Sequence, residues 1–419
     1  MASEEKMLKA SRKKLIIFNI CFISLVLAIA MDLFANTYPE KIFYFVSYVA
    51  VIYTFVQASK NRGVIYANRP LLLLCISLVL YALSKIIWAT MFKNTDFIDI
   101  RDNYYTVGKR FLLAAFILFY FYQCRNLLNK KVLGLSIIIL FIGLGISLWV
   151  GYLSRTLAEP RVKWTSDAAT TGSYLVVLIS MVTITLVRRY FGASKLSLLL
   201  FLLAFLVNMA MILMTETRSA IFLTPVLYIT FFLRYYNGIE KRLKALLAAI
   251  IFASAAIVLY CTWDRIAQIK SDIAEYHTNN DTSIGARFSI WKSGWHSVTD
   301  KFWGQSTDQR YLKVEEYIHQ YERANPEAAR NVAYHLHNDI LETLSLQGIF
   351  GLFSLLFFYI SCLYFSLNKR DGFSNNSTLF IISPVIAFGF TDVVLIQSNT
   401  ALVVIISLAL TIPLLKNAD

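Results

Sequence analysis

Charged side chains are scarce in this sequence. Asp, Glu, Lys and Arg make up 16% of its 419 residues, whereas hydrophobic residues make up 57%. The mean hydropathy of +0.57 is far above that of an ordinary soluble domain. The five cysteines are scattered through or beside apolar stretches without paired spacing, so neither a disulfide framework nor a zinc site is indicated. These scarcities exclude an ordinary soluble domain and indicate a protein whose solvent is the lipid bilayer.

The apolar residues are gathered in blocks whose length suits a membrane-spanning helix. A helix rises about 1.5 Å per residue, so roughly 20 apolar residues cross a hydrocarbon core about 30 Å thick. The sequence therefore predicts an all-α polytopic membrane protein with about 12 transmembrane helices. These spans are expected near residues 15–34, 41–58, 70–92, 111–124, 132–153, 172–187, 196–214, 219–236, 245–262, 348–367, 378–396 and 399–415.

The excess of cations, a net charge of +14, is spread between the apolar blocks. Because the cations are not gathered on one soluble face, the charge does not indicate nucleic-acid binding. Short connections rich in Lys and Arg lie on the cytoplasmic side of a membrane, which predicts both termini in the cytoplasm. These connections are residues 60–69, 125–131, 188–195, 234–244 and 369–370, with Lys416 near the C-terminus.

One long segment does not span, and the predicted topology puts it in the periplasm. We expect an N-terminal transmembrane bundle of about nine spans in residues 1–262, a periplasmic catalytic segment in 263–347 and a C-terminal bundle of about three spans in 348–419. A connection of this length without structure of its own is uncommon, so the segment should be helical and functional.

Two arginines lie where this topology brings charge to the outer face. Arg218 lies in a very short turn, Met214-Thr-Glu-Thr-Arg-Ser219, where a charge close to the membrane core is costly and suggests a bound anion. Arg287 opens a helix predicted after a plausible N-cap at 281–283. Guanidinium groups bind phosphate bidentately. The structural alternatives are a salt bridge to Glu216 or interfacial snorkelling for Arg218, and an ordinary solvated position for Arg287.

The helix after Arg287 carries an aromatic stripe. Phe288, Trp291 and Trp295 follow the three-then-four spacing of one helix face. Such a stripe packs against the membrane interface or stacks on a sugar ring, and the sequence favours the first.

A pair of histidines ends the long segment, in the run Tyr334-His335-Leu336-His337-Asn338-Asp339. Imidazole, with an ordinary pKa near 6.5, accepts a proton at neutral pH, as a general base for a sugar hydroxyl must. A structural role is the alternative for either histidine.

Ionisable residues within the apolar blocks are the remaining candidates. Asp392 is expected late in the eleventh span, where it could orient the catalytic histidine or order an acceptor. Asp32 and Lys85 also lie in apolar runs, and a structural pair between them is as plausible as a function. No metal is expected, because the outer face has no close D-x-D pair and the chain has no H-E-x-x-H motif.

These residues give the chain its resemblance to the O-antigen ligase family. That family has a motif of His, then Asn, Ser or Gln, nine free positions, Gly, two positions, and Gly, Thr or Tyr. His337, Asn338, Gly348 and Gly351 meet it at every fixed place, whereas His335 falls outside the register. The family's T-x-T-R-like turn is matched at 215–218, and its second arginine by 285–287, although Trp291 stands where the family has leucine.

The resemblance implies a metal-independent, GT-C-like glycosyltransferase without a cofactor, in the bacterial inner membrane. It would transfer O-antigen from undecaprenyl diphosphate to a hydroxyl of lipid A-core, and both partners are membrane lipids. His337 would be the general base, and Arg218 and Arg287 would bind the diphosphate. Asn338, Gly348, Gly351, Asp392 and His335 would support them.

Three other functions stay open. An O-antigen polymerase uses the same chemistry with a second carrier-linked acceptor, and a protein O-glycan transferase is a further relative in chemistry. A polysaccharide transporter or flippase is disfavoured, because the chain has no duplicated halves and the long segment would be unexplained.

Overall fold

The computed structural model describes residues 2–61, 63, 68–156, 159–236, 239–261, 263–368 and 373–414. The cations Arg62, Lys369, Arg370 and Lys416, which contributed to the predicted topology, lie outside the described residues. The described part is helical, and no strand occurs in it. Its helices are α1 Ala2–Met31, α2 Tyr38–Lys60, α4 Arg69–Met91, α5 Ile98–Gln123, η1 Arg125–Leu127, α6 Lys130–Ser154, α7 Ala169–Phe191, α8 Lys195–Thr215, α9 Arg218–Tyr235, α10 Lys241–Cys261, α11 Trp263–Ala274, α12 Ser283–His296, α13 Thr307–Tyr321, α14 Pro326–Val332, α15 Asp339–Leu367, α16 Phe373–Gly389, α17 Ser398–Thr411 and η3 Ile412–Leu414.

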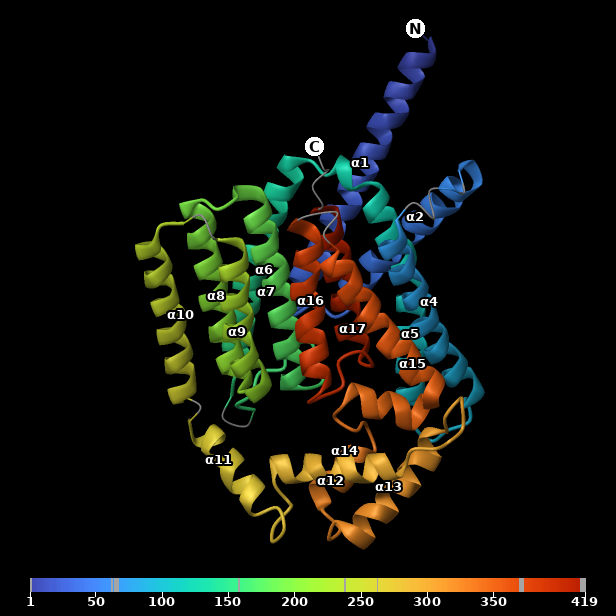
Figure 1. Ribbon diagram of the computed structural model, residues 1–419, viewed down its shortest axis with the longest axis vertical. Helices are drawn as coiled ribbons and strands as arrows, with labels where there is room; N and C mark the ends of the chain where they lie inside the picture. Colours follow the sequence, from blue (N-terminus) through green and yellow to red (C-terminus); the bar gives the residue numbers. More distant parts are fainter. Residues whose placement is uncertain are drawn as a thin grey trace.

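The molecule is a bundle of long apolar helices with a smaller helical layer across one end (Figure 1). Among the described residues, 8 helices are long and apolar enough to cross a membrane. Helices α5, α9, α16 and α17 occupy the places of the other predicted spans, and α5 begins well before its apolar stretch. The expected all-α polytopic membrane protein is thereby confirmed.

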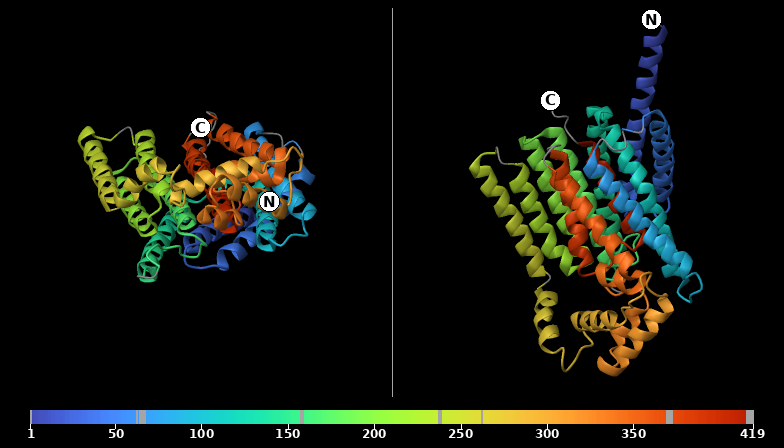
Figure 2. Two further views of the ribbon diagram at one scale, coloured as in Figure 1. Left: turned by 90° about the horizontal axis from the view of Figure 1, so that it is seen from below. Right: turned by 45° about the vertical axis from the view of Figure 1, so that its right-hand side comes forward.

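Helices α11 to α14, here called the cap, cover one end of the bundle (Figures 1 and 2). Both chain termini lie at the opposite end, here called the terminal end (Figure 1). The cap has a small apolar core of its own, in which Ile290 of α12 packs with Val314 and Ile318 of α13 and Val332 of α14. The expectation that this long segment carries its own helices is correct.

Of the 8 candidate spans among the described residues, helix α7 is the most enclosed, with 94% of its apolar window buried inside the molecule. It contacts α6, α8, α9, α16 and α17, so a polar side chain within that buried window lies inside protein and not in lipid. A buried polar side chain needs a hydrogen-bond partner, and Tyr174 in the first turns of α7 has one at the cap end, as shown below.

Helix α15 is broken at Gly348, whose φ of 65° and ψ of −157° are not helical. The segment 301–305 crosses the helix there, and a Cβ at Gly348 would lie 2.5 Å from the Lys301 carbonyl oxygen. Only glycine combines this backbone conformation with so close an approach. The break separates a short first part of α15, at the cap end, from the part that continues through the bundle.

One expectation and one alternative about buried charges are wrong. Residue Asp392 does not lie in a span, because α16 ends at Gly389 and Asp392 is in the loop that leads to α17. Asp32 and Lys85 do not form a pair: Asp32 interacts electrostatically with Arg110, whereas Lys85 Nζ lies 4.6 Å from the ring centroid of Tyr104. In an apolar run, hydropathy alone cannot say where a helix ends or which charges meet.

Candidate active site

His337 lies in the short link between α14 and α15, in a conformation that the following helix fixes. Asn338 caps α15, since its side-chain oxygen accepts from the backbone N–H groups of Ile340 and Leu341, each at 3.0 Å. The φ of His337 is 49°, a left-handed conformation that is costly for a residue with a Cβ. The indole of Trp291 donates to the His337 carbonyl oxygen at 3.2 Å. The capped helix and this indole therefore hold the strained residue in place.

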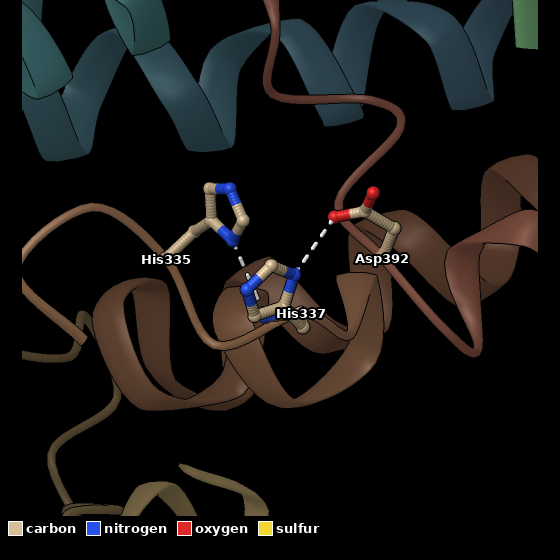
Figure 3. A group of neighbouring side chains, drawn as sticks. All are labelled: His335, His337 and Asp392. Carbon is tan, nitrogen blue, oxygen red and sulfur yellow. Dashed lines mark hydrogen bonds and ion pairs between the residues drawn. The ribbon is translucent and has the colours of Figure 1, made fainter. Parts of the chain in front are cut away.

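The imidazole of His337 pairs with Asp392, as Figure 3 shows. His337 Nδ1 lies 3.1 Å from Asp392 Oδ1, and the side chains are 17% and 3% exposed. An ionised carboxylate only accepts hydrogen bonds, so Nδ1 must carry the proton and Nε2 is left with a free lone pair. This is the tautomer that a general base needs.

Asp392 is held as a carboxylate by its surroundings. Its Oδ2 accepts from the Tyr174 hydroxyl at 3.1 Å and its Oδ1 from the Val393 N–H at 2.9 Å. Burial alone would raise the pKa of Asp392. The hydrogen bond from His337 and the electrostatic interactions with His337, His335 and Arg287 at the low pH where Asp392 would take up a proton outweigh burial and hold this pKa well below its usual range.

His335 lies beside His337 but has a different environment. The two ring centroids are 4.3 Å apart at an interplanar angle of 86°. Burial, and then the charge of His337, lower the pKa of His335 to about 4, so this imidazole is neutral at physiological pH. Its Nδ1 accepts from the His337 N–H at 3.4 Å, a long contact that matches a role in holding the turn.

Arg287 belongs to the same cluster. It is the fifth residue of α12, in the second turn after the N-cap Thr282, whose hydroxyl accepts from the Gly285 N–H at 3.1 Å. Arg287 interacts electrostatically with Asp392 and with Tyr174. The cap thus brings this arginine to the carboxylate that orients His337.

Arg218 begins α9 at the cap end. Glu216 follows α8 in a left-handed conformation, and Thr217 occupies the N-cap position of α9 without a side-chain capping bond, so the chain reverses within two residues. The Arg218 side chain is 18% exposed and faces α11, with Nη1 3.9 Å from Asp272 Oδ2. The next residue, Ser219, shares a side-chain hydrogen bond with Tyr174. Tyr174 therefore links the Arg218 turn to Asp392.

Behind the histidines, a buried ion pair fixes the link that carries them. Arg310 Nη1 and Glu342 Oε2 are 2.6 Å apart, and both side chains are 0% exposed. The same Glu342 oxygen accepts from the backbone N–H of Leu336, between the two histidines, at 2.8 Å. Tyr104 donates to the other Glu342 oxygen at 3.3 Å.

Asp339 fixes the opposite loop. Its Oδ1 accepts from the N–H groups of Val394 and Leu395, two and three residues after Asp392, at 3.1 and 3.3 Å. Its Oδ2 accepts from the Tyr359 hydroxyl at 3.3 Å. The first turn of α15 therefore holds both members of the His337–Asp392 pair.

The other residues suggested by the sequence have structural surroundings. Gly348 forms the break in α15, and a Cβ at Gly351 would lie 2.2 Å from the Cβ of Gln347. In the aromatic stripe, Trp291 contacts the His337 backbone, whereas Trp295 is 66% exposed. Sequence reasoning missed Tyr174 because a tyrosine in an apolar run carries no signal of its own.

The cluster also has a spacing that a metal ion could use. One ligand atom each from His335, His337 and Asp392 lies within 4.8 Å of the others, in a search of the described residues. The Asp392 oxygens, however, already accept from His337, Tyr174 and Val393. The absence of a metal from the reaction stays a prediction.

Together, these features define a polytopic, all-helical membrane protein with a candidate acid–base site where cap and bundle meet. Residues 199–356 match a family model described as O-antigen ligase. Over 404 residues the chain is 24% identical to the O-antigen ligase of Escherichia coli (strain K12), and the alignment covers 95% of this chain and 92% of that protein. The two findings support the O-antigen ligase family for this chain. The matched region contains Arg218, Arg287 and His337, whereas Tyr174 and Asp392 lie outside it.

Proposed function

We propose that this protein transfers O-antigen from undecaprenyl diphosphate to a sugar hydroxyl of lipid A-core, as an O-antigen ligase of lipopolysaccharide biosynthesis. The observation that carries the proposal is the His337–Asp392 pair, 3.1 Å apart, with Arg287 close enough to act on the carboxylate. A base for a hydroxyl and a fixed cation for a leaving diphosphate are what this GT-C-like transfer requires. The name of the relative fits this reaction.

In the proposed reaction, His337 Nε2 takes the proton of the acceptor hydroxyl while its oxygen attacks the anomeric carbon of the donor sugar. The bond from that carbon to the diphosphate oxygen breaks, and undecaprenyl diphosphate leaves with the electron pair. Arg218 and Arg287 neutralise the diphosphate as it leaves. Asp392 stabilises the imidazolium, which afterwards releases its proton to water.

The proposed topology puts the active site in the periplasm. The protein would lie in the inner membrane with both termini in the cytoplasm, and Lys60, Lys130 and Lys195 lie near helix ends at the terminal end, as the positive-inside rule requires. We propose the division into 1–262, 263–347 and 348–419 on the same basis. A cysteine introduced at Asp300, in the cap, into a chain lacking its native cysteines should react with a membrane-impermeant maleimide in intact cells.

The main test is a His337→Ala variant in a strain that lacks the chromosomal copy of the gene. We expect loss of the O-antigen ladder with rough core retained, because removing a general base costs about 10²–10⁴-fold in rate. His319→Ala, which changes an exposed histidine of α13, should leave the ladder unchanged. A normal ladder from His337→Ala would remove this residue from catalysis.

The same strain separates ligase from polymerase. A lost ligase leaves polymer on its lipid carrier, whereas a lost polymerase leaves single repeats attached to core. The second pattern would replace the proposed function by the polymerase.

Metal independence has its own test. The purified protein should keep its transfer activity in excess EDTA, because fixed guanidinium groups neutralise the leaving group. Loss of activity that zinc restores would instead assign His335, His337 and Asp392 to a metal.

A further inference from the structure

The terminal end has a basic hollow that the proposed reaction does not use. Its volume is about 440 Å³, and the side chains of Arg125, Lys130 and Arg189 line it with Asn126, Asn129 and Tyr190. The described residues that line it include no Asp or Glu. Among the described residues, none of the three cations has a carboxylate within ion-pair distance, although carboxylates pair with other cations of the bundle.

Besides its cationic side chains, the hollow has a helix N-terminus and a fixed guanidinium group that favour an anion. Helix α6 begins at Lys130, so the positive end of its dipole lies at the hollow, where the Asn129 side chain caps the Lys131 N–H at 2.9 Å. The guanidinium of Arg125 is held by the Tyr122 carbonyl at 2.9 Å and lies 4.2 Å from the Tyr122 ring centroid. This contact uses one of its five donors and fixes the direction of the others.

An apolar groove of about 860 Å³ adjoins the basic hollow. Tyr190 lines both spaces, and Lys130 and Lys131 are neighbours on α6, one lining the hollow and one the groove. The groove continues along α6 between Ile138, Phe141 and Ile142 and faces Leu203 and Val207 of α8. A site for a charged headgroup therefore continues into an apolar groove that can take a hydrocarbon chain.

Two glycines leave the groove open. At Gly134 a Cβ would lie 3.2 Å from the Tyr190 ring, at the junction of hollow and groove. At Gly145, farther along the groove, a Cβ would meet nothing within 4 Å. A Cβ added at Gly145 would thus enter the groove without displacing protein atoms, and a larger side chain would extend from open space.

From this arrangement we infer that the terminal end binds one anionic glycerophospholipid, with its phosphate headgroup in the basic hollow and an acyl chain in the groove of α6 and α8. Complementary charge selects an anionic headgroup, and the apolar groove requires a hydrocarbon chain, which free phosphate lacks. The inference does not depend on the proposed function, because the site lies at the opposite end of the bundle from His337.

The experiment uses the full-length protein purified in detergent. Phosphatidylglycerol, phosphatidylcholine or inorganic phosphate is titrated in, and bound molecules are counted by native mass spectrometry. The variants are the triple change Arg125→Gln/Lys130→Gln/Arg189→Gln and the single change Gly145→Leu. The control is Lys60→Gln/Lys195→Gln/Arg242→Gln, which removes three exposed cations that line neither hollow nor groove.

We expect wild type and control to retain one phosphatidylglycerol in preference to phosphatidylcholine. The triple variant should bind it at least about tenfold more weakly, because each lost cation weakens attraction to an anionic headgroup. Gly145→Leu keeps every charge and should also bind more weakly, because leucine fills the groove.

Equal binding of the two lipids, or wild-type binding by the triple variant, would overturn the inference and leave only annular lipid. Inorganic phosphate competing as well as phosphatidylglycerol, with no effect of Gly145→Leu, would overturn the acyl-chain part. Because Gly145→Leu removes no polar contact, its result stays informative if the triple variant fails to fold.

Discussion

Replacing Asp392 by Asn keeps the shape of the side chain and removes its charge. The single amide oxygen of asparagine can replace Oδ1 and accept from the Val393 N–H, or replace Oδ2 and accept from the Tyr174 hydroxyl, so one of these two contacts is kept. The loop between α16 and α17 also stays attached to Asp339 through the Val394 and Leu395 N–H groups. The substitution mainly affects the hydrogen bond with His337 Nδ1, which is 3.1 Å from Asp392 Oδ1. The carboxylate at this position can only accept a hydrogen bond, whereas the amide that replaces it can also donate one.

The expected loss of activity has two parts. A hydrogen bond to a charged partner contributes about 1.5–3 kcal/mol, which corresponds to roughly 10–150-fold in rate. If the new amide donates to Nδ1, the imidazole proton moves to Nε2 and the basic lone pair is lost. In the comparable Ser-His-Asp arrangement, this change of tautomer costs about 10⁴-fold. We therefore expect kcat to fall by about 10-fold to 10⁴-fold, the larger value if the tautomer changes.

The assay is steady-state transfer by the purified protein, with lipid-linked glycan as donor and lipid A-core as acceptor. The KM for either substrate should change little, because Asp392 is buried and acts through His337. Asp300→Asn, an exposed aspartate of the cap, is the matched control. A fall in kcat of less than about threefold, with normal protein in the membrane, would refute the role of Asp392 in orienting the base.

Three further changes test the surroundings of the site. Below pH 6.5 the unfolded chain binds a proton at His335 that the folded protein takes up only near pH 4, so the free energy of unfolding should fall by up to about 3 kcal/mol between these values. In His335→Gln, the melting temperature should therefore depend less steeply on pH over this range. An unchanged dependence on pH would contradict the assignment. Gly348→Ala should destabilise by at least about 1–3 kcal/mol because of its positive φ and the close Lys301 carbonyl, whereas Gly145→Ala should be neutral, as unfolding in detergent can measure. Glu342→Gln leaves the buried Arg310 guanidinium without a carboxylate and should lower the free energy of unfolding by about 3–5 kcal/mol. Adding Arg310→Met to the same chain should recover part of the folded protein, as measured by size-exclusion chromatography. No recovery would argue against an uncompensated charge as the cause.

Much of the fold could be predicted because the bilayer imposes a length on each span. The apolar blocks coincide with helices throughout the described bundle, and the long segment after residue 262 has the helices expected of it. The limits appear where a helix stops inside an apolar run. The block 378–396 reads as one span, yet α16 ends at Gly389, because the buried loop that follows has its backbone N–H groups satisfied by a carboxylate.

The candidate site could be predicted in part. The turn at Arg218, the arginine after Gly285-Ala286 and the histidine before Asn338 each have a local sequence pattern. Asp392 was a candidate only as a charge in an apolar run, and Tyr174 had no signal. The pairing of these two side chains depends on the packing of α7 against α16 and α17, which no local pattern encodes.

The first turn of α15 explains why the site needs acidic residues that do no chemistry. Glu342 accepts from the backbone beside His337, and Asp339 accepts from the backbone beside Asp392, so both loops are attached to one rigid element. A base and its carboxylate on two separate loops would drift apart with every loop motion, because a hydrogen bond weakens steeply with distance and angle. Anchoring both loops to one helix turn keeps the 3.1 Å contact while leaving Nε2 free. It follows that Asp339→Ala, which removes the acceptor of the Val394 and Leu395 N–H groups, should lower kcat although residue 339 does not contact substrate. Its effect should largely disappear in the Asp392→Asn background, where the contact that Asp339 maintains is already lost. Additive effects of the two changes would instead give Asp339 a role independent of the pair.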